Sequence, residues 1–187
     1  AGDTFSTADG SLLIESEAQF ALGATSGVSR GTGELLIDAA GNIILAGQIS
    51  GTGHAALLAA DAILAGADNS VQATDLILSS THGIASASQA LVTTVDRLAV
   101  RTGAAGVFIE NSGDLVIGNL GFAIVSLKPG AVENAAFSGF VGGVVAAQGG
   151  AIDIDNDGTA TVHSASASFD ALPGTDLAFS VLADAAG

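Results

Sequence analysis

The sequence predicts an all-β fold, a parallel β-helix in which the chain winds through stacked coils of about 21 residues. Apolar runs recur at a nearly constant interval, because Leu36, Leu57, Leu78 and Val100 are separated by 21, 21 and 22 residues. Hydrophobic residues make up 49% of the chain but aromatics only 4%, which suits a narrow interior filled with small aliphatic side chains. Gly is abundant and Pro scarce, and few turns are of the two-residue hairpin type. These features favour a stacked solenoid over an antiparallel sandwich.

The repeating unit is clearest in residues 33–47, GELLIDAAGNIILAG. Two apolar triplets flank an Ala-Gly-Asn segment that is typical of a turn, so the unit forms most of one coil with a corner at Gly41-Asn42. We expect Leu36 and Ile44 to face the interior, where they would stack on Leu57 and Leu64 of the next coil.

A second series of apolar segments alternates with the first, and its members begin at Asn42, Asp61, Gly83 and Val107. Each interval of about 21 residues therefore holds two or three short strands. The alternative for residues 55–67 is a helix, since Ala and Leu are strong helix formers. Asp61 would interrupt the apolar stripe of that helix, and the match to residues 33–47 favours strands.

The rhythm weakens after residue 116. Residues 127–143, LKPGAVENAAFSGFVGG, contain Pro129, several Gly and two of the eight Phe. The later apolar triplets at 124–125, 144–145, 160–162 and 179–181 are less evenly spaced. We therefore predict one β-helical domain over residues 1–187, with an irregular excursion at about 119–143.

The charge balance excludes several functions. Nineteen acidic and four basic residues give a net charge of −15, so binding of nucleic acid is not expected. The chain has no Cys, which excludes disulfides and thiolate metal sites. The longest apolar run, residues 55–67, is interrupted by Asp61 and is too short to insert into a membrane.

Residues 82–118, HGIASASQALVTTVDRLAVRTGAAGVFIENSGDLVIG, combine a Gly-Ile turn, a polar spacer and two apolar runs before Asn-Ser-Gly-Asp. This pattern resembles the repeats of filamentous-haemagglutinin-like proteins, which are large bacterial β-strand-repeat surface adhesins. The resemblance covers residues 33–118 best. It implies a right-handed parallel β-helix, secretion to the cell surface and a structural role as a rod segment of an adhesin, without enzyme activity. The implied partners are neighbouring repeats or identical subunits, and a host protein or glycan.

Two alternatives differ in class from a rod segment. A subunit of an extracellular filament would join end to end through open β-helix ends. A polysaccharide-active enzyme would need paired carboxylates, or a base with supporting cations, on one face. None of the four basic residues clusters with paired Asp in a motif carried by a strand, and nucleophile-elbow, P-loop and dinucleotide-binding motifs are absent.

The sharpest local motif is Asp153-Ile-Asp155-Asn-Asp157-Gly, whose alternate carboxylates have the spacing of a calcium loop. These three Asp residues are therefore a candidate calcium site. An EF-hand also needs a Glu at position 12, where this chain has Ser164. The other interpretation is a strand with outward Asp153 and Asp155 and inward Ile neighbours, followed by a turn.

The remaining candidates are histidines and aromatics. His54, His82 and His163 have no second ligand at metal spacing, so we expect them at the surface or in turns. The Phe side chains are expected in the core. Phe137 and Phe140 of the excursion are the candidates for a protein contact.

Overall fold

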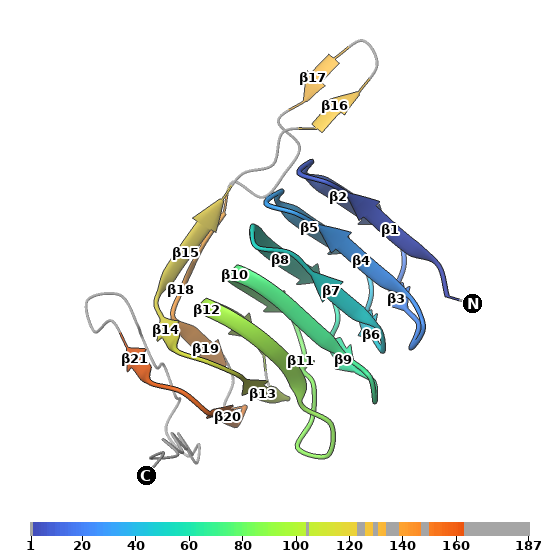
Figure 1. The fold of residues 1–187 in the computed structure, drawn as a ribbon. Coiled ribbons are helices and arrows are strands. Elements are labelled where there is room, and N and C mark those ends of the chain that lie inside the picture. The colour runs from blue at the N-terminus through green and yellow to red at the C-terminus, as the bar shows by residue number, and fades with distance from the viewer. Residues whose placement is uncertain are drawn as a thin grey trace.

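The computed structural model describes residues 2–103, 105–122, 126–128, 131–133, 139–146 and 150–162. Over these residues the protein is all-β, with parallel strands stacked as a β-solenoid of about five turns (Figure 1). The predicted parallel β-helix is confirmed, and its spacing is near 22 residues. None of these residues forms a helix that could span a membrane.

The first three coils contribute three short strands each. These strands are β1 (Thr4–Thr7), β2 (Leu12–Ser16), β3 (Phe20–Leu22), β4 (Gly27–Arg30), β5 (Leu35–Ala39), β6 (Ile43–Leu45), β7 (Gln48–Ser50), β8 (His54–Ala59) and β9 (Ile63–Ala65). The helix considered for residues 55–67 is wrong, because β8 and β9 occupy that segment with a turn between them.

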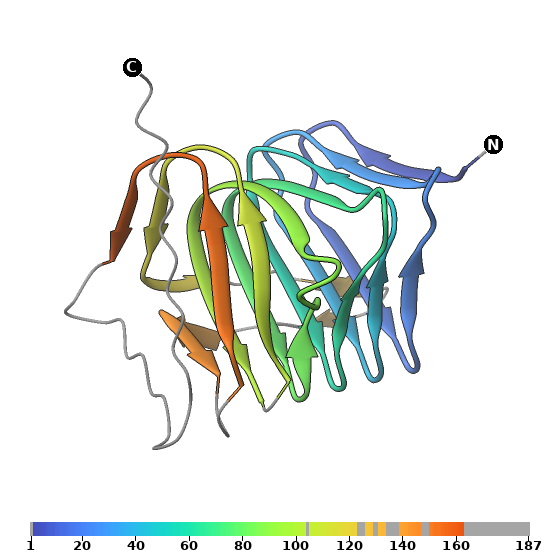
Figure 2. The ribbon, with the colours of Figure 1, turned by 90° about the horizontal axis from the view of Figure 1, so that it is seen from below.

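Two longer strands follow, β10 (Ser70–Ser80) and β12 (Leu91–Thr102), because the chain there bends through a corner without leaving the extended conformation. The remaining strands of the stack are again short: β11 (Gly83–Ile84), β13 (Gly106–Asn111), β14 (Leu115–Ile117), β19 (Val144–Ala146), β20 (Ile152–Asn156) and β21 (Ala160–Val162). Each strand pairs in parallel with a strand about one coil away, so the coils lie side by side along the stack (Figure 2).

The stack has three faces. The first contains β1, β4, β7 and the N-terminal parts of β10 and β12. The second contains β2, β5, β8 and the C-terminal parts of the same two long strands. The third contains β3, β6, β9, β11, β13 and β20.

The register confirms part of the predicted stacking and corrects the rest. Leu57 aligns with Leu78, and Leu78 with Val100, as predicted. Ile37, not Leu36, lies on Leu57. Leu36 instead pairs with Ala56 in a separate apolar cluster outside the coil. Because side chains alternate between the two sides of a strand, an error of one residue reverses the predicted side.

The same correction applies to the third face. Ile44 and Leu64 do pair, as predicted. Both point outward, however, and Leu64 is 41% exposed. Their neighbours Ile43 and Leu45 are fully buried in the interior cluster.

An antiparallel hairpin interrupts the stack after β14. Its strands are β15 (Asn119–Phe122) with β18 (Gly139–Gly142), and β16 (Ser126–Lys128) with β17 (Ala131–Glu133). The Gly143 amide donates a hydrogen bond to the Gly118 carbonyl (3.1 Å) at its base. The described residues of the predicted excursion therefore form paired strands. The triplets at 124–125 and 179–181 lie outside the described residues.

The β15–β18 pair of this hairpin lies over the outer side of the second face. Leu120 of β15 is 5% exposed and joins Leu36, Ala56, Ile77 and Ala99 in the outer apolar cluster. β15 contacts β10 and β12, and β18 contacts β12 (Figure 1). The part of the second face that this pair covers is consequently apolar on both sides.

Candidate functional site

The predicted calcium residues lie on β20 and in the turn that follows it. Ile152 and Ile154 are buried, whereas Asp153 and Asp155 are exposed, as the strand interpretation predicts. Asp157 has another role, because its Oδ1 accepts a hydrogen bond from the Gly113 amide at 2.6 Å. This bond joins the turn after β20 to the corresponding turn of the previous coil.

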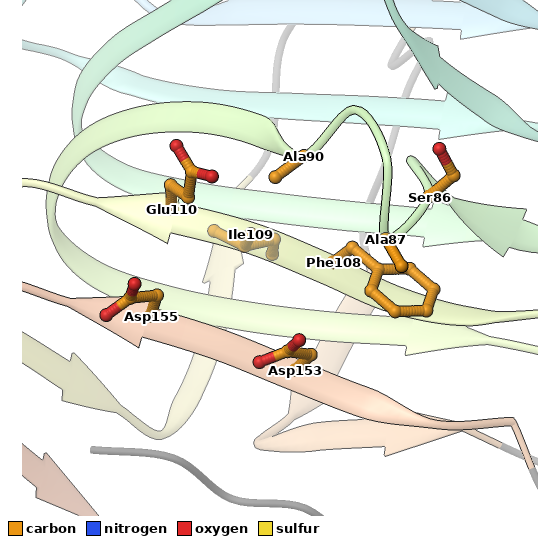
Figure 3. Close-up of a pocket in the computed structure, with 8 residues that line it drawn as sticks. All are labelled: Ser86, Ala87, Ala90, Phe108, Ile109, Glu110, Asp153 and Asp155. Atoms are coloured by element: carbon orange, nitrogen blue, oxygen red, sulfur yellow. The ribbon is translucent and has the colours of Figure 1, made fainter. Parts of the chain in front are cut away.

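The two exposed Asp side chains line a pocket of about 120 Å³ on the outer side of β13 and β20 (Figure 3). Strand pairing places Asp153 beside Phe108 and Asp155 beside Glu110. The loop between β11 and β12 supplies the opposite wall, and its first residue, Ala85, has a positive φ of 58°. The complete lining is Ser86, Ala87, Ala90, Phe108, Ile109, Glu110, Asp153 and Asp155.

This pocket is acidic and includes one aromatic side chain, Phe108, and its three carboxylate residues, Glu110, Asp153 and Asp155, are exposed. Phe108 is half-buried, not in the interior core where the sequence analysis placed the Phe side chains. Within the described part of the chain, no three His, Asp or Glu side chains are arranged to hold a metal ion. Calcium binding by Asp153, Asp155 and Asp157 stays a prediction.

Buried Asn side chains connect successive coils next to this pocket. The Asn111 amide nitrogen donates to the Asn156 side-chain oxygen at 2.8 Å. The Asn111 side-chain oxygen accepts hydrogen bonds from the Thr93 hydroxyl (2.9 Å) and the Val95 amide (3.0 Å). Since these groups are almost fully buried, the ladder satisfies backbone and side-chain donors that would otherwise lose water.

A column of charged side chains crosses the corner between the first and second faces. Strand pairing aligns His54 with Asp75, and Asp75 with Arg97, and Glu34 directly precedes the strand that pairs with β8. This column was not predicted from the sequence. Its signal was present, since the four residues follow the same spacing as the apolar series: Glu34, His54, Asp75 and Arg97.

Asp75 is the centre of the column. Its side chain is only 3% exposed. The Arg97 guanidinium donates from Nε to Asp75 Oδ1 at 2.5 Å and from Nη2 to Oδ2. His54 Nδ1 lies 2.6 Å from Asp75 Oδ2. A buried carboxylate needs such partners, because an ion without them is strongly disfavoured away from water.

The other side of His54 faces Glu34, whose Oε1 lies 4.0 Å from His54 Nε2. Glu34 Oε2 is buried and has no hydrogen-bond partner. Burial raises the pKa of Glu34, and the nearby His54 and Arg30 oppose that rise. Glu34 is therefore the group in this column whose ionisation the fold disfavours.

Arg30 lies at the end of β4 and is only 2% exposed. Its guanidinium donates one hydrogen bond to the Gly33 carbonyl (3.1 Å) and another to the carbonyl of Gly53 in the next coil (3.4 Å). Burial lowers the pKa of Arg30, and Glu34 opposes the change. Arg30 thus fixes the backbone of two coils beside the charged column.

The three histidines differ in position. His82 is at the surface, with 67% of its side chain exposed, and pairs with Asp61 at 2.5 Å. His54 has 37% of its side chain exposed, yet it connects two acidic residues of different coils. His163 lies outside the described residues. The predicted surface or turn position is correct for His82. The prediction did not include the contacts that His54 makes with the acidic residues of the charged column.

The geometry defines the class of the chain as an acidic parallel β-solenoid with a polar column at one corner and an open pocket on another face. No family profile, curated protein or solved structure matches the chain. The resemblance to haemagglutinin-like repeats therefore rests on the sequence pattern alone, and its functional implications belong to a proposal.

Proposed function

We propose that the protein is a structural rod segment of a secreted or surface-attached bacterial adhesin. The observation that supports this function best is the continuous coil-to-coil pairing of strands around a filled apolar interior. Coils stacked in this way rise by about 4.7–4.9 Å each. A body built from them has a length set by the number of coils, which is the property that a spacer needs.

The composition of the interior also supports a scaffold. The buried positions are almost entirely aliphatic. Buried polar residues such as Ser80, Thr102, Asn111 and Asn156 bond to backbone groups or to one another, and Asp75 bonds to Arg97 and His54. Contacts with a host protein or glycan would then involve the outer surface. The sequence resemblance, and not a bound ligand, is the reason for naming adhesion and secretion.

The second candidate function is a filament subunit that joins end to end. It is supported by the unpaired strand edges at the N-terminal end of the stack. Within the described residues, β1, β2 and β3 each pair on one side only. Phe5 occupies an interior position beside Val28 but is 53% exposed, which overturns its predicted core position. Leu12, Ile14 and Phe20 are half-buried at the same end. Such an edge can template pairing with another coil.

Solution shape separates these functions. Light scattering coupled to size exclusion, with small-angle X-ray scattering, should show an elongated monomer for a rod segment. Concentration-dependent fibres in negative stain would instead establish the filament subunit. In that case Phe5→Glu should suppress fibres, whereas Leu64→Glu, on the outer side of the third face, should not. Release of reducing or unsaturated ends from a polysaccharide panel would contradict both structural functions.

Calcium binding needs its own measurement. If Asp153, Asp155 and Asp157 bind calcium, the melting temperature should rise between EDTA and millimolar calcium. Asp153→Asn combined with Asp155→Asn should remove that rise, while Asp61→Asn, on another part of the surface, should retain it. An identical melting temperature with and without calcium would refute the site.

A further inference from the structure

We propose that the outer side of the first face is a binding surface for an uncharged glycan chain. Its centre is a groove of about 370 Å³ over β1, β4, β7 and the turn before β4, and its polar lining is Thr4, Thr25, Ser26, Ser29, Gln48 and Ser50. The inference rests on the proposed adhesin function, which it deepens by naming a class of ligand and the residues that would contact it.

The outward positions of the first face carry no charge. In β1, β4 and β7 the one charged residue is Arg30, and it is buried. The long strands continue the pattern, since Gln72 and Thr94 are exposed on the same side. The other two faces carry acidic side chains outward, such as Asp38 and Asp153. The first face therefore suits a neutral ligand, whereas the net charge of −15 would repel an anionic one.

The polar side chains of this face are available to a ligand. At the following corner, hydroxyls are used inside the protein, because Thr52 Oγ1 donates to the Gly31 carbonyl (3.4 Å) and Thr74 Oγ1 to the Thr52 carbonyl (2.6 Å). Ser29 and Gln48 are exposed, and their side chains make no hydrogen bond among the described residues. Hydroxyl and amide groups both donate and accept, which is what the hydroxyls of a sugar require.

The dimensions of the face favour a slender ligand over a folded protein. Five strands side by side cover about 24 Å, and the outward positions of one strand extend over about 10 Å. The resulting area of roughly 240 Å² is far below the ~800 Å² that each partner buries in a stable protein interface. An extended peptide cannot add to this face as a further strand, because β4 is already paired with β1 on one side and β7 on the other.

The repetition of the face matches the repetition of a polysaccharide. Ser6 pairs with Ser29, and Ser29 with Ser50, so equivalent positions of successive coils carry a hydroxyl. Farther along the stack, Gln72 pairs with Thr94. A glycan chain that lies along the axis would meet similar groups at each coil. Contacts that are weak one by one then add, because each further sugar binds at a high effective concentration.

An NMR titration with neutral oligosaccharides tests the surface. The probes are linear hexasaccharides of glucose, mannose, galactose and N-acetylglucosamine, and a heparin hexasaccharide is the anionic comparison. At least one neutral probe should shift the amide signals of residues 25–29 and 48–50 and leave those of Asp153 and Asp155 unchanged. The shifts should saturate at millimolar concentrations of the probe.

Gly27 offers a substitution that fills the groove without straining the fold. A Cβ at Gly27 would lie 3.5 Å from the Gln48 carbonyl oxygen and 3.9 Å from Thr4 Cγ2, which are ordinary contacts. Gly27→Val should weaken binding by about ten-fold, the equivalent of one or two hydrogen bonds. The melting temperature should not fall, because Val suits a strand better than Gly. Ala21→Val, on the outer side of the third face, is the matched control and should leave the affinity unchanged.

Three results of the titration would overturn the proposal: no shift with any neutral probe, tighter binding of the heparin probe, or an affinity that Gly27→Val leaves unchanged. Shifts at the same residues that depend on protein concentration without a glycan would assign the face to a second copy of the chain, and would also overturn it. The scattering measurement of the rod uses no glycan. An elongated monomer that binds none of the probes would therefore refute this inference and leave the rod function standing.

Discussion

The chain forms a regular stack from β4 to β12 and an interrupted stack from β13 to β21. In both parts strands pair in parallel with strands of the adjacent coil, but the number of residues between paired strands differs. In the regular part, hydrogen-bonded partners in adjacent coils are separated by 20 to 23 residues. In the interrupted part, Asn111 and Asn156 are 45 residues apart but still bond directly. The hairpin accounts for the difference, so register depends on contact between coils and not on a fixed length of chain.

The largest effect should come from a cavity in the regular stack. Leu57 is fully buried between Ile37 and Leu78, so Leu57→Ala should destabilise the fold by about 2–5 kcal/mol. Ile154→Ala is the comparison in the interrupted part, where β20 has Ile109 on one side. Urea unfolding should show the smaller loss for Ile154→Ala, and the reverse order would contradict the comparison.

Removal of the hairpin should have the next largest effect. Because Gly143 already bonds to Gly118, residues 119–142 can be replaced by a short Gly-Ser connection. The solenoid should keep its β-sheet circular dichroism and lose about 1.5–3 kcal/mol, since Ile77 and its neighbours become exposed. Loss of all cooperative folding would mean that the hairpin is needed to form the stack and does not simply cover it.

The buried Asn ladder should give a loss of about 1–3 kcal/mol. Asn111→Ala leaves the Val95 amide and the Asn156 side-chain oxygen without their partner. Asn119→Ala, in the hairpin, is the matched control. Chemical denaturation should show little change for the control; a similarly small change for Asn111→Ala would indicate that water replaces its hydrogen bonds.

The smallest effect concerns Asp38 on the outer side of β5. Burial raises the pKa of Asp38, and the charge of Glu15 adds to that rise. The folded protein is therefore favoured when Asp38 is protonated, and this contribution disappears as the pH rises through the raised pKa. Asp38→Asn should slightly raise the melting temperature at pH 7 but not at pH 3. An unchanged difference between the two pH values would contradict this assignment.

The fold could be predicted because a solenoid repeats its signal. Each coil places similar residues at similar positions, so the alignment of Leu57, Leu78 and Val100 is present in the sequence itself. The side on which a residue lies was harder to predict. In β5 three consecutive apolar residues, from Leu35 to Ile37, are all buried, because the outer side of the second face has its own apolar cluster.

The site was predicted less well than the fold. The outward Asp153 and Asp155 follow from simple alternation along a strand, but the pocket beside them depends on the loop that carries Ala87. The residues of the charged column are spaced by about one coil. Opposite charges at that spacing predict a contact only when the register of the strands is known, because an error of one residue moves a side chain to the other side of its strand. The spacing of 28 residues between His54 and His82 does not match the coil, so the histidines do not contact each other. The side-chain neighbours of His54 are Glu34 and Asp75, which a comparison among histidines could not identify.

The direction of the inter-coil hydrogen bonds has a mechanical consequence. These bonds run along the axis of the stack, so a tensile load on that axis pulls each coil directly away from the next and does not shear the strands past one another. We expect such a load to detach the coils one after another, starting at one end of the stack. Each event in a regular coil should release about 22 residues. That length corresponds to roughly 75 Å of extended chain. A rod of this kind would yield in equal, countable steps, and its remaining coils would stay intact while it lengthened.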